Sequence, residues 1–155
     1  MYFALGSIPI WLSKHKIDDL IPECFKATYP NTRVIIDCTE IRTQQPPFLV
    51  LNSELYSAYK GTSTFKCLLG IAPHGAVTFI SSLYTGCISD VEITKFSGFL
   101  DLIEPGDDVM ADKDFTIRKL LAEKDVTLNI PPFLSSKGRF IGKEIQNLLV
   151  EFNCF

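Results

Sequence analysis

Two aspartates that follow short apolar runs are the residues of this sequence best suited to metal chemistry. Asp37 follows the β-branched residues 34–36, and Asp112 follows residues 108–111, DVMA. A buried carboxylate costs several kcal/mol unless it is paired, hydrogen-bonded or bound to a metal. A pair of carboxylates suits Mg²⁺ or Mn²⁺, cations that commonly serve phosphoryl transfer. Spacing alone leaves two interpretations equally open, namely a shared metal site or two separate turn and capping residues.

The bulk properties of the chain indicate a single globular domain. It has 155 residues, a net charge of −3 and a pI of about 5.3. This length supports one domain with a substantial core. The net negative charge argues against a chain that binds DNA tightly by itself. It does not exclude a DNA enzyme whose main DNA-binding module lies elsewhere.

The cysteines and histidines argue against the commoner disulfide and metal sites. The five cysteines are odd in number and no two have the C-x-x-C spacing, so neither a disulfide framework nor a zinc cluster is indicated. Only His15 and His74 could supply imidazole ligands. No signal peptide is evident, and no apolar run reaches the roughly 20 residues of a membrane span. We therefore expect an intracellular chain with reduced thiols and no membrane association.

The first half of the sequence predicts a helical lead-in followed by three strands. The lead-in is an amphipathic stretch that Pro22 interrupts, so it forms one short helix or one that restarts at the proline. A strand over 33–41 follows, with Asp37 at the end of its buried part. The apolar residues 67–72 and the alternating residues 76–84 flank a Pro-His-Gly turn, which predicts an antiparallel hairpin.

The second half predicts alternating helices and strands. These elements are, in chain order, a helix from Ser89 or Asp90 to residues 105–106, a strand over 108–111, a helix capped by Thr116, a strand over 126–133 and a helix from about Gly142.

This order distinguishes between two classes of fold that place an acid on the first strand. The D-x-T string at 37–39 matches the aspartyl-nucleophile phosphatases, but their parallel sheet needs a crossover where this sequence has a hairpin. Three antiparallel strands followed by alternating helices and strands indicate instead an α/β fold, an RNase H-like mixed sheet with flanking helices. In that fold the first acid lies on strand one and the second at the end of strand four, the places of Asp37 and Asp112.

Specific strings extend this interpretation to a family. The strings are IIDCTEI, YSAYKGTSTFKCLLGIAPHGAVTFISSLYTGCISD, SGFLDLIEPGDDVMADKDF and VTLNIPPF. They resemble the nuclease domain of PIF/Harbinger-type transposases, the DDE superfamily endonucleases, from about Tyr2 to about Gln146. The resemblance implies that Asp37 and Asp112 are the first two acids of a catalytic triad. Each would bind one or two divalent cations, Mg²⁺ or Mn²⁺, at a DNA phosphate.

Other positions of the resemblance carry less definite roles. Asp90 lies in the string G-x-I-S-D, where the alternatives are an unassigned family role and the N-cap of the following helix. Glu40 fits the family string, but strand alternation places it on the opposite face from Asp37, so we do not assign it as a ligand. Four further residues fit a family pattern and either contact a phosphate backbone or form a solvated strand face: Tyr59, Lys60, Thr64 and Lys66.

The sequence also departs from the family pattern. Asp114 stands where the family usually has glycine, which adds charge two residues from Asp112. The third acid, a glutamate in a string like H-V-E-R, falls beyond Phe155; Glu151 would replace it only if the last helix were repositioned. A helix-turn-helix segment that precedes the family's nuclease domain is also missing. We therefore expect a helical lead-in over 1–30 and a C-terminally truncated DDE endonuclease domain over 31–155, whose last catalytic helix is incomplete.

These observations predict a transposase-derived, metal-dependent DNA endonuclease and strand-transfer domain. We expect its activity to be absent or weak because the third acid is missing. We expect it to bind DNA weakly without the helix-turn-helix segment, and to be located in the nucleus. The alternative is a non-catalytic domesticated or relic binding protein with a protein partner, attached through the apolar sheet face that an incomplete last helix leaves open. An unstable chain without function fits the truncation equally well.

Overall fold

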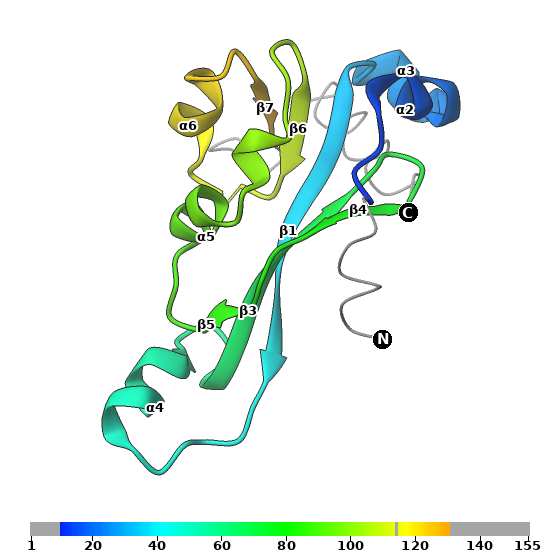
Figure 1. Cartoon of the computed structure of the whole chain (residues 1–155). Helices are drawn as coiled ribbons and strands as arrows, with labels where there is room; N and C mark the ends of the chain where they lie inside the picture. The colour runs from blue at the N-terminus through cyan, green and yellow to red at the C-terminus, as the bar shows by residue number, and fades with distance from the viewer. Residues whose placement is uncertain (1–9, 114, 131–155) are drawn as a thin grey trace, which may run out of the picture.

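The structure has a mixed α/β fold built on one curled sheet (Figure 1). It is a computed structural model that describes residues 10–113 and 115–130. The sheet within these residues has seven strands, which are β1 (Thr32–Arg42), β2 (Tyr56–Ser57), β3 (Thr62–Ile71), β4 (Val77–Ile80), β5 (Tyr84–Thr85), β6 (Asp108–Ala111) and β7 (Thr127–Asn129). The helices of this part are α2 (Lys14–Leu20), α3 (Glu23–Thr28), α4 (Leu49–Leu55), α5 (Asp90–Phe96), the 3₁₀ helix η1 (Phe99–Asp101) and α6 (Arg118–Ala122).

The strand order confirms the predicted fold class. The sheet runs β2-β3-β1-β6-β7, with β4 and β5 also paired to β3. β1 is antiparallel to β3, and β3 forms the predicted antiparallel hairpin with β4. On the other side of β1, β6 pairs parallel to β1 and β7 pairs parallel to β6. Three antiparallel strands followed by parallel strands and helices are compatible with an RNase H-like fold. None of the helices in the described ranges has the length and hydropathy required to cross a bilayer.

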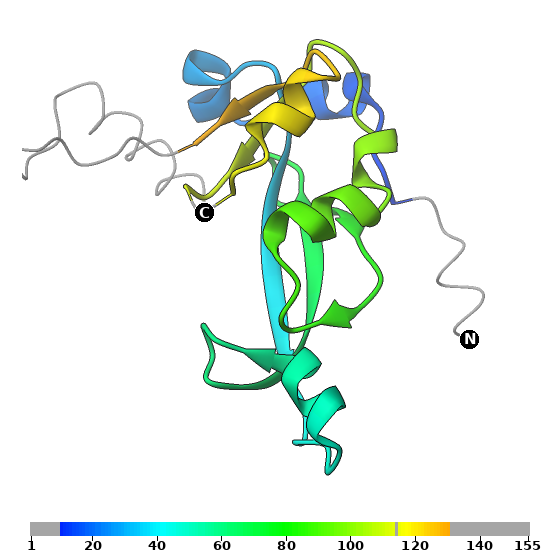
Figure 2. The same cartoon turned by 90° about the vertical axis from the view of Figure 1, so that its left-hand side faces the viewer.

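The core lies mainly between the sheet and the helices that follow the hairpin. Val34 and Ile36 of β1 and Leu68 of β3 are buried on one face, where they join Ile93 and Phe99 from α5 and η1. Alternation along the strand sends Ile35 to the opposite face, toward α2 and α3. Figure 2 shows α5 and α6 in front of the sheet and the blue helices α2 and α3 behind it.

Pro22 divides the N-terminal helical stretch, as its sequence predicted. α2 ends at Leu20 and α3 begins at Glu23, with Pro22 at the N-cap. The carbonyl of Pro22 accepts from the amides of Phe25 and Lys26. The turn therefore starts α3 without needing the amide proton that proline lacks.

Two predictions about the helices were wrong, and one helix was missed. α5 does not reach residues 105–106 but ends at Phe96, because Gly98 adopts φ +79° and the chain continues as η1. α6 begins at Arg118 with Ile117 at its N-cap, and the side chain of Thr116 does not cap it. The sequence analysis also missed α4. The helix predicted from Gly142 lies outside the described residues.

A buried acid ties the lead-in, β1 and β6 together. The side chain of Asp107 is fully buried, immediately before β6. Its Oδ1 accepts from Lys14 Nζ at 3.0 Å, and its Oδ2 accepts from the Glu104 amide at 3.0 Å and lies 3.5 Å from Arg33 Nε. The Arg33 guanidinium also lies 5.1 Å from the centre of the Trp11 ring. These contacts offset the cost of burying Asp107 and part of the cost of burying Arg33, whose Nε and Nη1 have no hydrogen-bond partner among the described residues.

We predict that Asp107→Ala will lower the free energy of unfolding by about 3–5 kcal/mol, because it leaves the Arg33 charge buried without its partner. Urea denaturation followed by circular dichroism measures this change. Asp101→Ala is the matched control, since that carboxylate is exposed and 3.9 Å from Lys124, and its effect should stay within about 0.5 kcal/mol. Equal effects of the two substitutions would contradict the role given to Asp107.

Candidate active site

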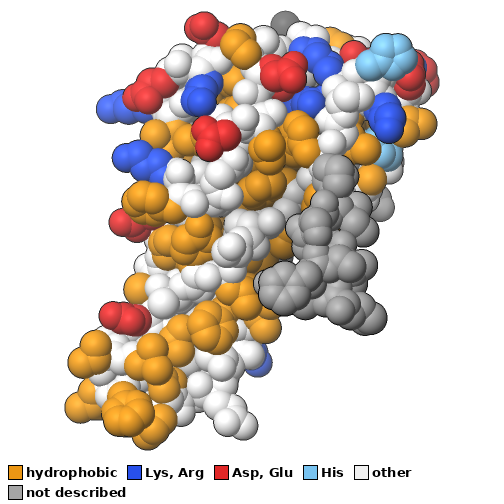
Figure 3. Space-filling view, viewed as in Figure 1, with side chains coloured by type: hydrophobic (Ala, Val, Ile, Leu, Met, Phe, Trp, Pro, Cys, Tyr) orange, Lys and Arg blue, Asp and Glu red, His pale blue; other side chains and the backbone are white. Residues whose placement is uncertain are grey.

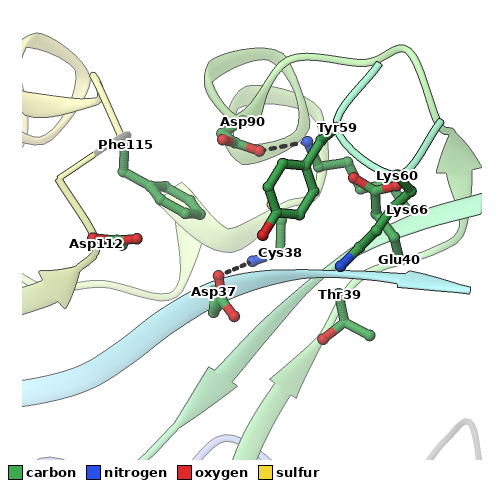
Figure 4. A pocket seen from close by; sticks show the side chains of 10 residues that line it. All are labelled: Asp37, Cys38, Thr39, Glu40, Tyr59, Lys60, Lys66, Asp90, Asp112 and Phe115. Carbon is green, nitrogen blue, oxygen red and sulfur yellow. Dashed lines mark hydrogen bonds and ion pairs between the residues drawn. The ribbon is translucent and has the colours of Figure 1, made fainter. Parts of the chain in front are cut away.

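A cavity of about 570 Å³ opens where β1 stops pairing with β6 (Figure 4). Its walls come from β1, the turn between β2 and β3, the adjoining part of β3, the start of α5 and the segment after β6. The lining residues are Asp37, Cys38, Thr39, Glu40, Tyr59, Lys60, Lys66, Asp90, Asp112 and Phe115. The cavity therefore gathers acidic and basic side chains from segments that are far apart in the sequence.

The sheet brings the two predicted acids to this cavity from neighbouring strands. The last parallel pair between β1 and β6 is Ile36 beside Ala111. Asp37 and Asp112 are the next residue of each segment. Because the two backbones run in the same direction, residues at matching positions lie on the same side of the sheet. Both carboxylates line the cavity.

One detail of the prediction for Asp37 was wrong. β1 extends to Arg42, close to the predicted end of the strand at 41, so Asp37 lies inside the strand. Its side chain is not buried but exposed, because the pairing with β6 stops at Ile36. A cation is therefore not required to offset a burial cost at this position. What remains is the placement of Asp37 beside the segment that carries Asp112.

The free oxygens of the two acids fit a divalent cation. Asp37 Oδ1 accepts from the Cys38 amide at 2.8 Å, and Asp112 Oδ1 accepts from the Lys113 amide at 2.6 Å. Neither carboxylate forms an ion pair with another described residue, so each keeps an oxygen for a ligand. Mg²⁺ commonly takes one or two carboxylates and completes its shell with water and phosphate oxygens. Within residues 10–113 and 115–130, no group of three or more possible metal ligands is found.

Asp90 has a different partner in the same cavity. Its Oδ1 lies 2.6 Å from Lys66 Nζ, which also donates to the Ile88 carbonyl at 3.2 Å. Burial by itself would lower the pKa of Lys66, but the hydrogen bond and charge of Asp90 outweigh it and raise that pKa. The N-cap alternative for Asp90 was wrong. Ser89 is the N-cap and forms a capping box with Glu92, so Asp90 is the first residue of α5.

The four residues of the predicted phosphate-contact pattern divide into two pairs. Thr64 is fully buried and its Oγ1 donates to Glu40 Oε2 at 2.9 Å, while Lys66 is held by Asp90. These two residues therefore do not form a solvated strand face. Tyr59 and Lys60 are exposed at the rim of the cavity. For this second pair, phosphate contact stays a prediction. Asp114 and Glu151 lie outside the described residues.

The sequence analysis missed Cys38 and Phe115 as residues of the cavity wall. Alternation along β1 was a usable signal for Cys38. Neighbouring residues of a strand face opposite sides of the sheet, so the side chain of Cys38 points toward α5 and that of Asp37 points away from α5. Burial, and next the negative charge of Asp90, raise the pKa of the Cys38 thiol. This thiol therefore stays protonated and unreactive at neutral pH. Phe115 lies in the DKDF string at 112–115, where the sequence offers no helical or strand periodicity.

We predict that Asp90→Asn will increase the rate of Cys38 alkylation by iodoacetamide several-fold at mildly alkaline pH. Removing the neighbouring negative charge lowers the pKa of the thiol, so more of the reactive thiolate is present. Peptide mapping by mass spectrometry measures the rate at each cysteine.

Two thiols of the same chain serve as controls. Cys87 is exposed and should react rapidly in both proteins, while the buried Cys67 should stay slow in both. Faster labelling of Cys67 would reveal general loosening of the fold. An unchanged rate at Cys38 would show that Asp90 does not control this thiol.

Comparison with known proteins identifies the family. Residues 36–147, most of the chain, match the sequence model of the DDE superfamily endonucleases. No curated protein and no solved structure matched. The matched stretch contains both Asp37 and Asp112, and members of this superfamily generally use divalent metals. The chain therefore belongs to the DDE superfamily endonucleases.

Proposed function

We propose that this chain is the DNA endonuclease and strand-transfer domain of a PIF/Harbinger-type transposase, with Asp37 and Asp112 as ligands of a divalent cation. The observation that carries the proposal is the pairing of Ile36 with Ala111, which leaves the two acids side by side at the cavity. The family match over residues 36–147 and the resemblance of the quoted strings support the same assignment.

The proposed chemistry divides between the cation and the chain. A bound Mg²⁺ or Mn²⁺ would supply charge neutralisation at the phosphate and activation of the attacking oxygen. Asp37 and Asp112 would hold that cation through their free carboxylate oxygens. The Cys38 and Lys113 amides fix the orientation of the two carboxylates through the bonds to their Oδ1 atoms. Positioning of this kind supplies much of the rate enhancement in such reactions.

The proposed activity is weak rather than strong. Two acids, Asp37 and Asp112, line the cavity in the described residues, whereas a third ligand normally fixes the geometry of a hard cation. The net charge of −3 also predicts weak attraction for DNA. An activity on chromosomal DNA would place the chain in the nucleus.

A second candidate function is a non-catalytic binding protein. The observation that favours it is the apolar surface at α4, where Phe48, Leu49 and Val50 are 73%, 85% and 73% exposed. Figure 3 shows hydrophobic side chains gathered at this end of the molecule. Exposed apolar patches often mark protein interaction sites.

We predict that the chain binds Mn²⁺ weakly in isothermal titration calorimetry and that Asp37→Asn or Asp112→Asn each removes most of this binding. Each substitution removes a carboxylate oxygen with negative charge from the site. Glu40→Gln is the control, because Glu40 lines the same cavity but accepts from Thr64, and it should keep the wild-type affinity.

The second measurement is nicking of supercoiled plasmid DNA with Mn²⁺ and with EDTA. Nicking that needs Mn²⁺ and is lost in both asparagine variants supports the nuclease. A folded wild-type chain that neither binds Mn²⁺ nor nicks would contradict the proposal and favour the binding protein.

A further inference from the structure

The turn between β2 and β3 is built to hold Lys60 in one backbone position. Ser57, which precedes the turn, is 2% exposed, and its Oγ accepts from the Lys60 amide at 3.2 Å. Its carbonyl accepts from the Gly61 amide at 2.8 Å. Gly61 adopts φ +63°, a conformation that favours glycine, and Ser57 pairs with Thr62 to close the turn. Lys60 therefore projects from an ordered turn.

The side chain of Lys60 is guided by an aromatic ring. Its Nζ lies 4.5 Å from the centre of the Tyr59 ring, a cation–π contact. The Tyr59 side chain is itself 84% exposed, so the protein core does not require it there. Figure 4 shows both side chains reaching from the turn toward β1 in the cavity.

Lys60 is the cavity lysine that keeps its charge available. The other one, Lys66, lies 2.6 Å from Asp90. Across the described part of the chain Lys60 has no ion pair, and Glu40, the acid on the adjoining wall, accepts from Thr64. Asp37 and Asp112 also lack a cationic side chain as a partner among these residues. The cavity thus holds two free carboxylates and, on another wall, a free ammonium.

This separation of charge fits a phosphodiester. A cation held by the two acids would take phosphate oxygens on one side, and the ammonium would take an anionic oxygen on another. Lysine acts on phosphate as a compact point charge, so it needs no fixed angle of approach. The aromatic ring 4.5 Å away favours a position of the ammonium at the exposed rim of the cavity.

We propose that Lys60, positioned by the Ser57–Gly61 turn and the Tyr59 ring, contacts a backbone phosphate of DNA that enters the Asp37–Asp112 cavity. This inference rests on the proposed function and deepens it. In this proposal Lys60 contacts the phosphate, and Lys66, which pairs with Asp90, does not.

Fluorescence anisotropy with a labelled DNA duplex tests the contact on the full chain, over a range of KCl concentrations and with either EDTA or Ca²⁺. Lys60→Ala should weaken binding roughly three- to tenfold and reduce the slope of log affinity against log salt by about one, the effect of losing one phosphate contact. Lys60→Arg should keep most of the affinity and the slope. Lys119→Ala, which removes an exposed lysine from α6, should match the wild type.

Each outcome decides for or against the contact. The contact would be overturned if Lys60→Ala and the wild type had the same DNA affinity and the same salt slope. It would also be overturned if the wild type bound no DNA with either EDTA or Ca²⁺. Equal losses in Lys60→Ala and Lys119→Ala would also overturn it, because they would show a diffuse charge effect. The metal site is tested separately, since Lys60→Ala should leave Mn²⁺ affinity unchanged. Lys60-dependent DNA binding without any Mn²⁺ binding would keep this contact and remove the proposed metal chemistry.

Discussion

The register between β1 and β6 is the constraint on which the candidate site depends. Thr32 lies beside Asp108 and Val34 beside Val109, so β1 uses one extra residue, Arg33, against β6. Without that irregularity Asp112 would lie beside Ile36, whose side chain faces the core. A slip of one residue sends every side chain of a strand to the other face. The irregularity at Arg33 is therefore what places Asp112 level with Asp37.

The same irregularity is held by buried charge. The Arg33 side chain is 2% exposed and pairs with Asp107, which directly precedes β6 and also binds Lys14 of α2. A buried ion pair is weak support for net stability but can specify one arrangement over its alternatives. We infer that this cluster fixes the register, because its contacts cannot be kept if either strand slips. Structure far from the cavity thus determines which acids meet there.

Three acids that line the cavity behave differently because their partners differ. Asp90 is held by Lys66, and Glu40 accepts from Thr64, so both are engaged inside the protein. Among the described residues, the Asp37 carboxylate accepts only from the neighbouring Cys38 amide, and it faces solvent. Their sequence contexts do not show this difference, since each acid lies on or next to a regular element. The distinction between a structural acid and a candidate ligand comes from cross-strand and helix contacts.

The sequence by itself predicted the order of the main strands, the α/β class and the superfamily, and it singled out the two acids that line the cavity, because alternation, turn residues and the quoted strings are local signals. It did not determine that α5 stops at Phe96, that the side chain of Asp37 is exposed, or that Asp90 and Lys66 pair. Nor did it separate Lys60 from Lys66. Those features depend on register and on which segment covers which face, and both are set by contacts between residues far apart in the chain. Only the tertiary structure could decide them.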